Sequence, residues 1–239
     1  MSNIFHSDNL DKDFSSFEMA ISKTNSFTHS FEDSQKPTLK KYHRLTYAIA
    51  LIENKLEEKW AETHRFLFLN EILSDLLSNV SISYIGFYHP SQILIRRLIE
   101  NFYNHIYYYE HPVEYELLNL GRNEYTPILT LKEYLESHPT VKPIRDKNIK
   151  IHNDNLFQNY QELCRTVHTK GEDFMGLAKN LEEIKPKFDI QKHLDWTNKI
   201  ILSMIYLLYK FHQELTFTNT ELVIISRAFP KDERNELLG

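Results

Sequence analysis

The chain contains little glycine, proline or cysteine. It has five Gly, eight Pro and one Cys in 239 residues. A fold built from many short strands needs frequent turn residues, so this composition disfavours an all-β protein. The single cysteine, Cys164, cannot form an intramolecular disulfide, and we expect it to lie on an apolar helix face.

Several common catalytic and binding motifs are also missing. The sequence has no glycine-rich phosphate loop, no paired cysteines, no HExxH and no GxSxG. It has no uninterrupted apolar run of the about 20 residues that cross a bilayer. The N-terminal segment has no apolar core of the signal-peptide kind. We therefore predict no metal, no cofactor and no membrane contact, and we expect a cytoplasmic protein.

The residues that are present suit a packed core. Hydrophobic residues make up 41% of the chain and aromatic residues 13%. A chain of this length can bury one large core. The formal net charge of −5 gives no overall attraction to nucleic acid, so any such binding must use a local basic patch.

The most apolar stretch is residues 189–215. Between Ile200 and Phe211 its apolar side chains point almost all the way round a helix. A helix that is apolar on every side must be enclosed by other helices. The sequence therefore predicts an all-α protein, a bundle of roughly seven to nine helices with this helix near its centre.

Helical periodicity continues along most of the chain. Two apolar stripes, at 42–60 and 66–80, point in different directions. This pattern favours two helices, or one kinked helix, with a break near 61–64; the alternative is one long helix that packs on different neighbours at its two ends. Segment 222–226 fits either a helix or a strand. Further helices are expected at 91–110, 113–120, 127–137, 154–169 and 172–184.

Two segments are expected to lie outside this regular pattern. Residues 1–37 are rich in Ser, Asp, Asn and Thr with scattered Phe, and we interpret them as a loosely docked N-terminal arm with one short helix at 10–22. Residues 139–153 contain two prolines and several basic residues, which favours a loop. The predicted organisation is a single helical-bundle domain over 38–239, preceded by the arm.

Polar residues gather on one half of the expected 91–110 helix. Glu100 can form an ion pair with Arg96 at i−4 or with Arg97 at i−3. A solvated face is the plain interpretation. Apolar and aromatic residues lie on the same side, however, and they favour a partly buried Arg–Glu pair, with Asn101 and Asn104 nearby.

A second polar pair lies on the expected 154–169 helix. Arg165 and His168 are neighbours at i, i+3, and His168 falls near the helix C-terminus, where the dipole favours its charged form. His168 can serve as a general acid or base or contact a phosphate. In the structural alternative it binds an end carbonyl and packs on Tyr160 and Cys164.

Two segments carry a resemblance to a known group of proteins. They read ILIRRLIENFYNHIYYYEHP at 93–112 and NLFQNYQELCRTVHTKG at 155–171. Over about 90–215 the chain resembles uncharacterised bacterial helical proteins grouped near the HEPN superfamily and abortive-infection proteins. The resemblance maps the shared polar positions onto Arg97, Glu100, Tyr160 and His168. Active HEPN proteins also carry an Arg followed, after four to six residues, by a His on a helix, a spacing that Arg145 and His152 match.

The resemblance implies a prokaryotic phage-defence or stress-response protein, acting as a metal-independent ribonuclease. His168 would then transfer protons, Arg97 or Arg165 would stabilise phosphate charge, and Glu100 would orient the arginine. The remaining residues expected to bind substrate RNA are Asn101, Asn104, Tyr160, Lys142, Arg145, Lys147 and Lys150.

Two other functions remain open from the sequence. One is a non-catalytic helical module that forms a homodimer or holds a protein partner, with the Arg–Glu pair as a structural element. The other is a small-molecule sensor with a pocket walled by Tyr103, Tyr107 and Tyr108.

Overall fold

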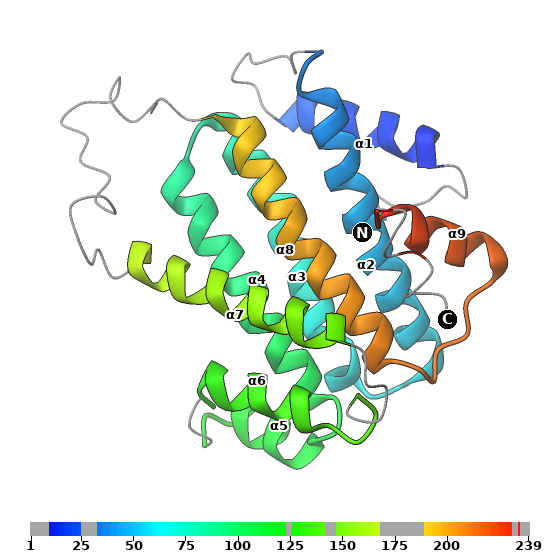
Figure 1. Cartoon of the computed structure of the whole chain (residues 1–239), viewed down its shortest axis with the longest axis vertical. Coiled ribbons are helices and arrows are strands. Elements are labelled where there is room, and N and C mark those ends of the chain that lie inside the picture. Colours follow the sequence, from blue (N-terminus) through cyan, green and yellow to red (C-terminus); the bar gives the residue numbers. More distant parts are fainter. Residues whose placement is uncertain are drawn as a thin grey trace.

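The computed structural model describes residues 10–24, 33–122, 126–141, 147–167, 189–230 and 234. Over these ranges the regular secondary structure is helical and contains no strand (Figure 1). The predicted all-α helical bundle is therefore confirmed. None of the described helices is long and apolar enough to cross a membrane.

The helices follow one another with short connections where the chain is described. They are α1 (Leu10–Thr24), α2 (Lys36–Lys59), the short 3-10 helix η1 (Thr63–Arg65), α3 (Leu67–Ile85), α4 (Tyr88–Tyr108), α5 (Pro112–Asn119), α6 (Ile128–Ser137), α7 (Lys147–Val167), α8 (Ile190–Phe211) and α9 (Asn219–Arg227). The predicted helices at 113–120 and 127–137 correspond to α5 and α6.

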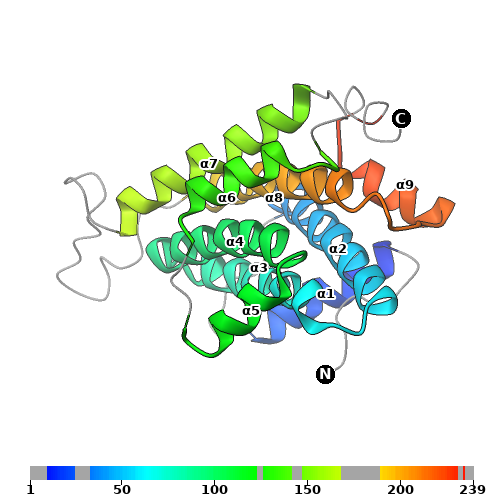
Figure 2. The same ribbon diagram turned by 90° about the horizontal axis from the view of Figure 1, so that it is seen from below.

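Helix α8 lies at the centre of the bundle, as predicted. It contacts α2, α3, α4 and α7, and Figure 2 shows it running between α2 and α7. Asp189 caps its N-terminus by accepting a hydrogen bond from the backbone N–H of Lys192. Ile201, Met204 and Ile205 are fully buried, and each such side chain stabilises the fold by about 1.5–3 kcal/mol.

The predicted break between the first two long helices is also confirmed. α2 ends at Lys59, η1 follows, and α3 starts at Leu67. The guanidinium of Arg65 lies 4.3 Å from the centre of the Trp60 ring, which holds the turn. α3 ends at Gly86, whose φ of 91° is a left-handed conformation that favours glycine.

Helices α4 and α8 run parallel, and buried polar contacts join them near both ends. Ser91 Oγ lies 3.0 Å from His193 Nε2 near the two N-termini. His105 Nε2 lies 2.8 Å from His212 Nε2 near the two C-termini. These contacts fix the register of α4 against α8, so the N-terminal turns of both helices lie together.

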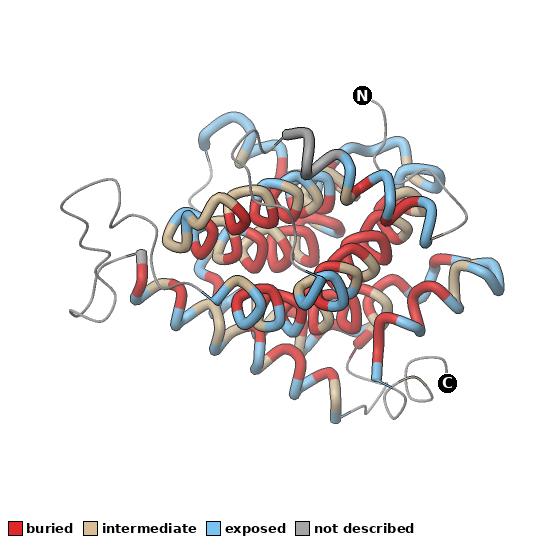
Figure 3. The backbone as a smooth tube through the Cα atoms, turned by 90° about the horizontal axis from the view of Figure 1, so that it is seen from above, coloured by how far each residue is buried: buried red, intermediate tan, exposed pale blue. Residues whose placement is uncertain are grey.

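The expected loop at 139–153 is wrong from residue 147 onward, because α7 begins at Lys147. Ile149, His152, Asn153 and Leu156 are all buried, so the start of α7 has an inward face despite its basic residues. Figure 3 shows buried residues along the inward sides of the helices. The undecided segment at 222–226 is helical, and Thr218 and Glu221 form a capping box at the start of α9.

The described part of the N-terminal arm is held by side chains rather than lying loosely. In α1, Phe14 and Phe17 are buried in the main core. Asp13 is buried as well, and its carboxylate lies 2.6 Å from His43 Nε2 on α2. The predicted helix at 172–184 lies outside the described residues.

Candidate ligand pocket and the predicted polar residues

Arg97 faces α3 rather than the other predicted site residues. Its Nε donates to Asp75 Oδ2 at 2.7 Å, and its second guanidinium nitrogen pairs with Asp75 and Glu71. Asp75 is only 1% exposed. Burial raises the pKa of Asp75, while the hydrogen bonds and charge of Arg97 oppose that rise. Arg97 is therefore the counter-ion of a buried carboxylate.

Glu100 belongs to a different ion pair. Its carboxylate lies 2.9 Å from the guanidinium of Arg96, and that guanidinium lies 5.7 Å from the centre of the Tyr160 ring on α7. Of the two partners expected for Glu100, the structure therefore has Arg96 and not Arg97, because adjacent residues on α4 point to different neighbouring helices. Tyr160, expected to bind substrate, contacts Arg96 instead.

The remaining predicted residues do not form a described cluster. Arg165 is exposed and lies 3.4 Å from Glu162, in a pair whose side chains are 62% and 53% exposed. Lys147 and Lys150 are exposed, Asn101 is half-buried and Asn104 is buried. His168, Lys142 and Arg145 lie outside the described residues, so the roles predicted for them are not tested.

Two other predicted features contact the core. His152 is buried, its Nδ1 lies 3.0 Å from Ser203 Oγ, and its ring lies 4.4 Å from that of Tyr206. Tyr103 and Tyr108 are buried, and the Tyr103 hydroxyl donates to Asn153 Oδ1 at 2.7 Å. These two tyrosines are core residues and Tyr107 is half-buried, so the tyrosine-walled pocket stays a prediction.

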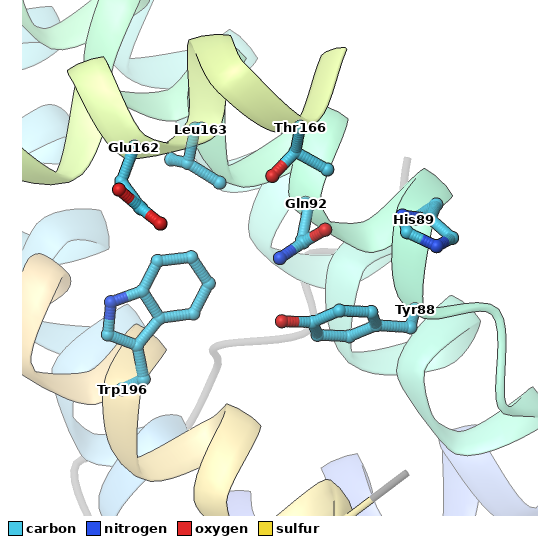
Figure 4. Close-up of a pocket in the computed structure, with 7 residues that line it drawn as sticks. All are labelled: Tyr88, His89, Gln92, Glu162, Leu163, Thr166 and Trp196. Atoms are coloured by element: carbon cyan, nitrogen blue, oxygen red, sulfur yellow. The ribbon is translucent and has the colours of Figure 1, made fainter. Parts of the chain in front are cut away.

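A pocket of about 260 Å³ opens elsewhere, between the N-terminus of α4, the last turns of α7 and the second turn of α8. Figure 4 shows the seven side chains that line it. They are Tyr88, His89, Gln92, Glu162, Leu163, Thr166 and Trp196. None of these residues was predicted as a site residue.

One wall of the pocket is aromatic and fixed in place. The His193 ring packs against both aromatic rings of the lining: its centre lies 5.6 Å from that of Tyr88 and 5.9 Å from that of Trp196. The Trp196 indole N–H donates to Asn159 Oδ1 at 2.7 Å. Burial lowers the pKa of His193 to about 4, so its imidazole is neutral at pH 7.

Gln92 supplies a buried amide at the same pocket. Its side chain is 7% exposed. It shares a hydrogen bond with the Tyr88 hydroxyl, and this bond partly offsets the rise that burial causes in the pKa of Tyr88. The Gln92 Oε1 atom is shielded from solvent and has no hydrogen-bond partner among the described residues.

The polar lining comprises the Glu162 carboxylate, which only accepts hydrogen bonds, and four groups that both donate and accept: the Gln92 amide, the hydroxyls of Tyr88 and Thr166 and the ring of His89. The described lining contains no lysine or arginine. The described residues contain no cluster of three His, Cys, Asp or Glu that could hold a metal ion.

The opposite end of α4 is closed by a second polar cluster, which we call the histidine cluster: His105, Tyr109, His212 and Glu214. His212 Nδ1 lies 3.1 Å from Glu214 Oε1, which also accepts a 2.6 Å hydrogen bond from the Tyr109 hydroxyl. Burial lowers the pKa of both histidines. Both rings are buried, so the cluster joins helices and offers no open site.

Sequence reasoning missed the pocket because its lining comes from the ends of three helices. The available signal was aromatic residues beside helix termini, at Tyr88 and Trp196. Comparison with protein-family models, curated proteins and solved structures finds no match to this chain. The HEPN resemblance therefore stays a prediction.

Proposed function

We propose that the protein is a non-catalytic helical binding module that holds a small organic ligand in the pocket between α4, α7 and α8. One observation carries this proposal: Gln92, a buried amide, lines an aromatic-walled cavity and its oxygen has no partner in the described structure. Most buried polar groups in native proteins are hydrogen-bonded, so such a group at a cavity points to a missing ligand.

The geometry favours binding over catalysis. A general acid or base and a charge-stabilising group must both reach the same reacting atom. Arg97 and Glu100 are held in separate ion pairs with Asp75 and Arg96. Ser91 Oγ donates to the Tyr88 carbonyl at 2.8 Å and is buried, so the Ser91–His193 contact has the character of a structural link.

The proposal is tested with a library of several hundred small fragments that includes neutral, cationic and anionic members. Binding is followed through the indole N–H resonances of ¹⁵N-labelled protein, because the chain has only two tryptophans, Trp60 and Trp196. We expect some fragments to shift Trp196 and leave Trp60 unchanged. A library in which no fragment shifts Trp196 alone would contradict the binding function.

Metal-independent RNA cleavage in phage defence is the second candidate function. The observation that favours it is the start of α7 at Lys147, which puts His152 on a helix, as in the Arg-to-His motif of HEPN proteins. The burial of His152 against Ser203 and Tyr206 counts against it. RNA binding, and the formation of a homodimer or a complex with a protein partner, also remain predictions from the sequence.

Incubation with total RNA and tRNA distinguishes the two candidates. The binding function predicts that the wild-type protein leaves both RNAs intact. The nuclease function predicts cleavage that His168→Ala or His152→Gln abolishes while the variants keep the wild-type helical circular-dichroism spectrum. Cleavage that both variants retain would indicate a contaminating nuclease.

A further inference from the structure

The chemistry of the pocket lining indicates which class of ligand it takes, provided that the proposed binding function is correct. The unsatisfied group is an acceptor, Gln92 Oε1. The terminal torsion of a glutamine is soft and roughly two-fold, so a half-turn of the amide exchanges the positions of its oxygen and its NH2 group and places the oxygen on the side that faces Tyr88 and Trp196 in Figure 4. The Glu162 carboxylate is a second acceptor. A ligand that satisfies both must carry N–H or O–H donors.

The charge of the lining favours a cation. Glu162 contributes a negative charge, and the described lining has neither lysine nor arginine to oppose it; the other ionisable side chains there are Tyr88 and His89. Its contact with Arg165, at 3.4 Å, joins two largely exposed side chains. Such surface pairs are worth about 0–1 kcal/mol, so a bound cation can replace Arg165 at little cost.

The aromatic wall supports the same conclusion. The indole N–H of Trp196 is already used by Asn159, so this residue offers the cavity its ring rather than a donor. Tyr88 offers a second ring beside the same His193. In Figure 4 the rings of Tyr88 and Trp196, the Gln92 amide and the Glu162 carboxylate surround one space. Aromatic rings beside a carboxylate are a common arrangement for binding organic cations.

The size of the pocket limits the ligand. Its volume of about 260 Å³ is below the about 300–1,000 Å³ usual for drug-sized ligands. We propose that the pocket binds a small organic cation with N–H donors, an alkylguanidinium or alkylammonium group. Its N–H groups donate to Gln92 Oε1 and Glu162, and its charge lies against Trp196 and Tyr88.

The test compares ethylguanidinium with ethylurea, a neutral molecule of the same shape, by titration into ¹⁵N-labelled protein. Choline, a cation without N–H donors, and adenosine monophosphate, an anion with a planar base, complete the set. We expect ethylguanidinium to shift the Trp196 indole resonance with a dissociation constant of about a millimolar, as befits so small a ligand. Ethylurea, choline and adenosine monophosphate should bind at least about tenfold more weakly.

Trp60 is an internal control for these titrations. It contacts Arg65, which also lies 4.7 Å from the ring centre of Tyr109 at the far end of α4. α4 has 21 residues and is therefore about 30 Å long. A Trp60→Phe variant assigns the two resonances, and the Trp60 resonance should stay fixed throughout.

Two variants assign the binding to the proposed groups. Gln92→Leu and Glu162→Gln should each raise the dissociation constant of ethylguanidinium at least about tenfold. Glu133→Gln, an exposed carboxylate on α6, is the matched control and should bind like the wild type. The two pocket variants differ in burial, so a folding defect in one leaves the other as a test.

Each remaining outcome overturns the proposal. Equal binding of ethylurea would show that charge is not recognised, and tighter binding of adenosine monophosphate would show that the pocket takes anions. If none of the four probes shifts Trp196 but fragments of another class do, the ligand class is wrong and the binding function stands. If the whole fragment library fails as well, the binding function is wrong too.

Discussion

The two ends of α4 are joined to α8 by different sets of buried polar contacts. At the C-terminal end, His105, Tyr109, His212 and Glu214 join α4 to the end of α8 through a chain of hydrogen bonds. At the N-terminal end, the Ser91–His193 contact makes the corresponding link, and Gln92 beside it lines a pocket. Each end has a buried polar atom without a partner among the described residues, Gln92 Oε1 and His105 Nδ1, but of these two residues only Gln92 lines the pocket. We interpret the polar residues at the closed, C-terminal end as stabilising the fold, and those at the open, N-terminal end as binding a ligand.

This difference separates polar residues that hold the fold from polar residues that are available to a ligand. A buried polar group stabilises a protein only when it is paired, and leaving it unpaired costs about 1–3 kcal/mol. Variants at the two ends should therefore behave differently, and the predictions below run from the largest expected effect to the smallest.

Acidification should destabilise the protein through the buried histidines at both ends of α4. The folded-state pKa values of His105, His193 and His212 are lowered by burial, so the unfolded chain binds more protons below pH 6.5. Stability is then fully present above pH 6.5 and is lost as the pH falls below it. For His193 the loss is complete near pH 4 and amounts to about 3 kcal/mol.

Urea denaturation at pH 7.5, 6, 5 and 4 measures this dependence. The interval from pH 6.5 to pH 5 is the informative one, because most carboxylates titrate below it. His193→Gln should reduce the loss in that interval relative to the wild type. If His193→Gln loses as much stability in that interval as the wild type, the assignment of His193 as neutral is wrong. Glu53, whose pKa burial raises to about 7, titrates in the same range in both proteins and cancels from this comparison.

Truncation at the closed end should cost more than truncation at the open end. His105→Ala removes a fully buried ring and leaves the Nε2 atom of His212 without its partner, at a cost of about 3 kcal/mol. Ser91→Ala removes the hydroxyl that links α4 to His193 and should cost about 1 kcal/mol. Urea denaturation at pH 7.5 compares the two, and equal losses would remove the distinction between the ends.

The ion pair between Arg97, near the middle of α4, and Asp75 on α3 should be structural. Arg97→Ala leaves the carboxylate of Asp75 buried and unpaired, which should destabilise the protein by about 2 kcal/mol. Adding Asp75→Asn removes the buried charge and should restore most of the loss. If the double variant is no more stable than Arg97→Ala, the contact with Asp75 is not what Arg97 provides.

The sequence predicted the parts of the fold that depend on local periodicity. The central helix α8 could be identified because apolar residues surround it, and the break before α3 because two stripes point in different directions. The start of α7 was missed because prolines and basic residues precede it, although Ile149, His152 and Leu156 already form a buried face.

The site was much less predictable than the fold. The sequence indicated Arg–Glu pairs within α4, because residues at i+3 and i+4 are neighbours on one helix. It could not indicate that Arg97 pairs with Asp75 on α3, since that contact depends on how two helices pack. The pocket was missed for the same reason: Gln92, Glu162 and Trp196 come together only in the folded bundle.

The most direct test of the difference between the two ends is the free energy of unfolding of Gln92→Leu, measured by urea denaturation at pH 7.5. The change replaces a buried amide that lacks a partner for its oxygen with an apolar side chain of similar size. We predict a change within about 0.5 kcal/mol of the wild type, in either direction, despite the burial of this residue. A loss of about 2 kcal/mol or more would mean that Gln92 stabilises the fold as His105 does. That result would contradict the assignment of the open end as a binding site.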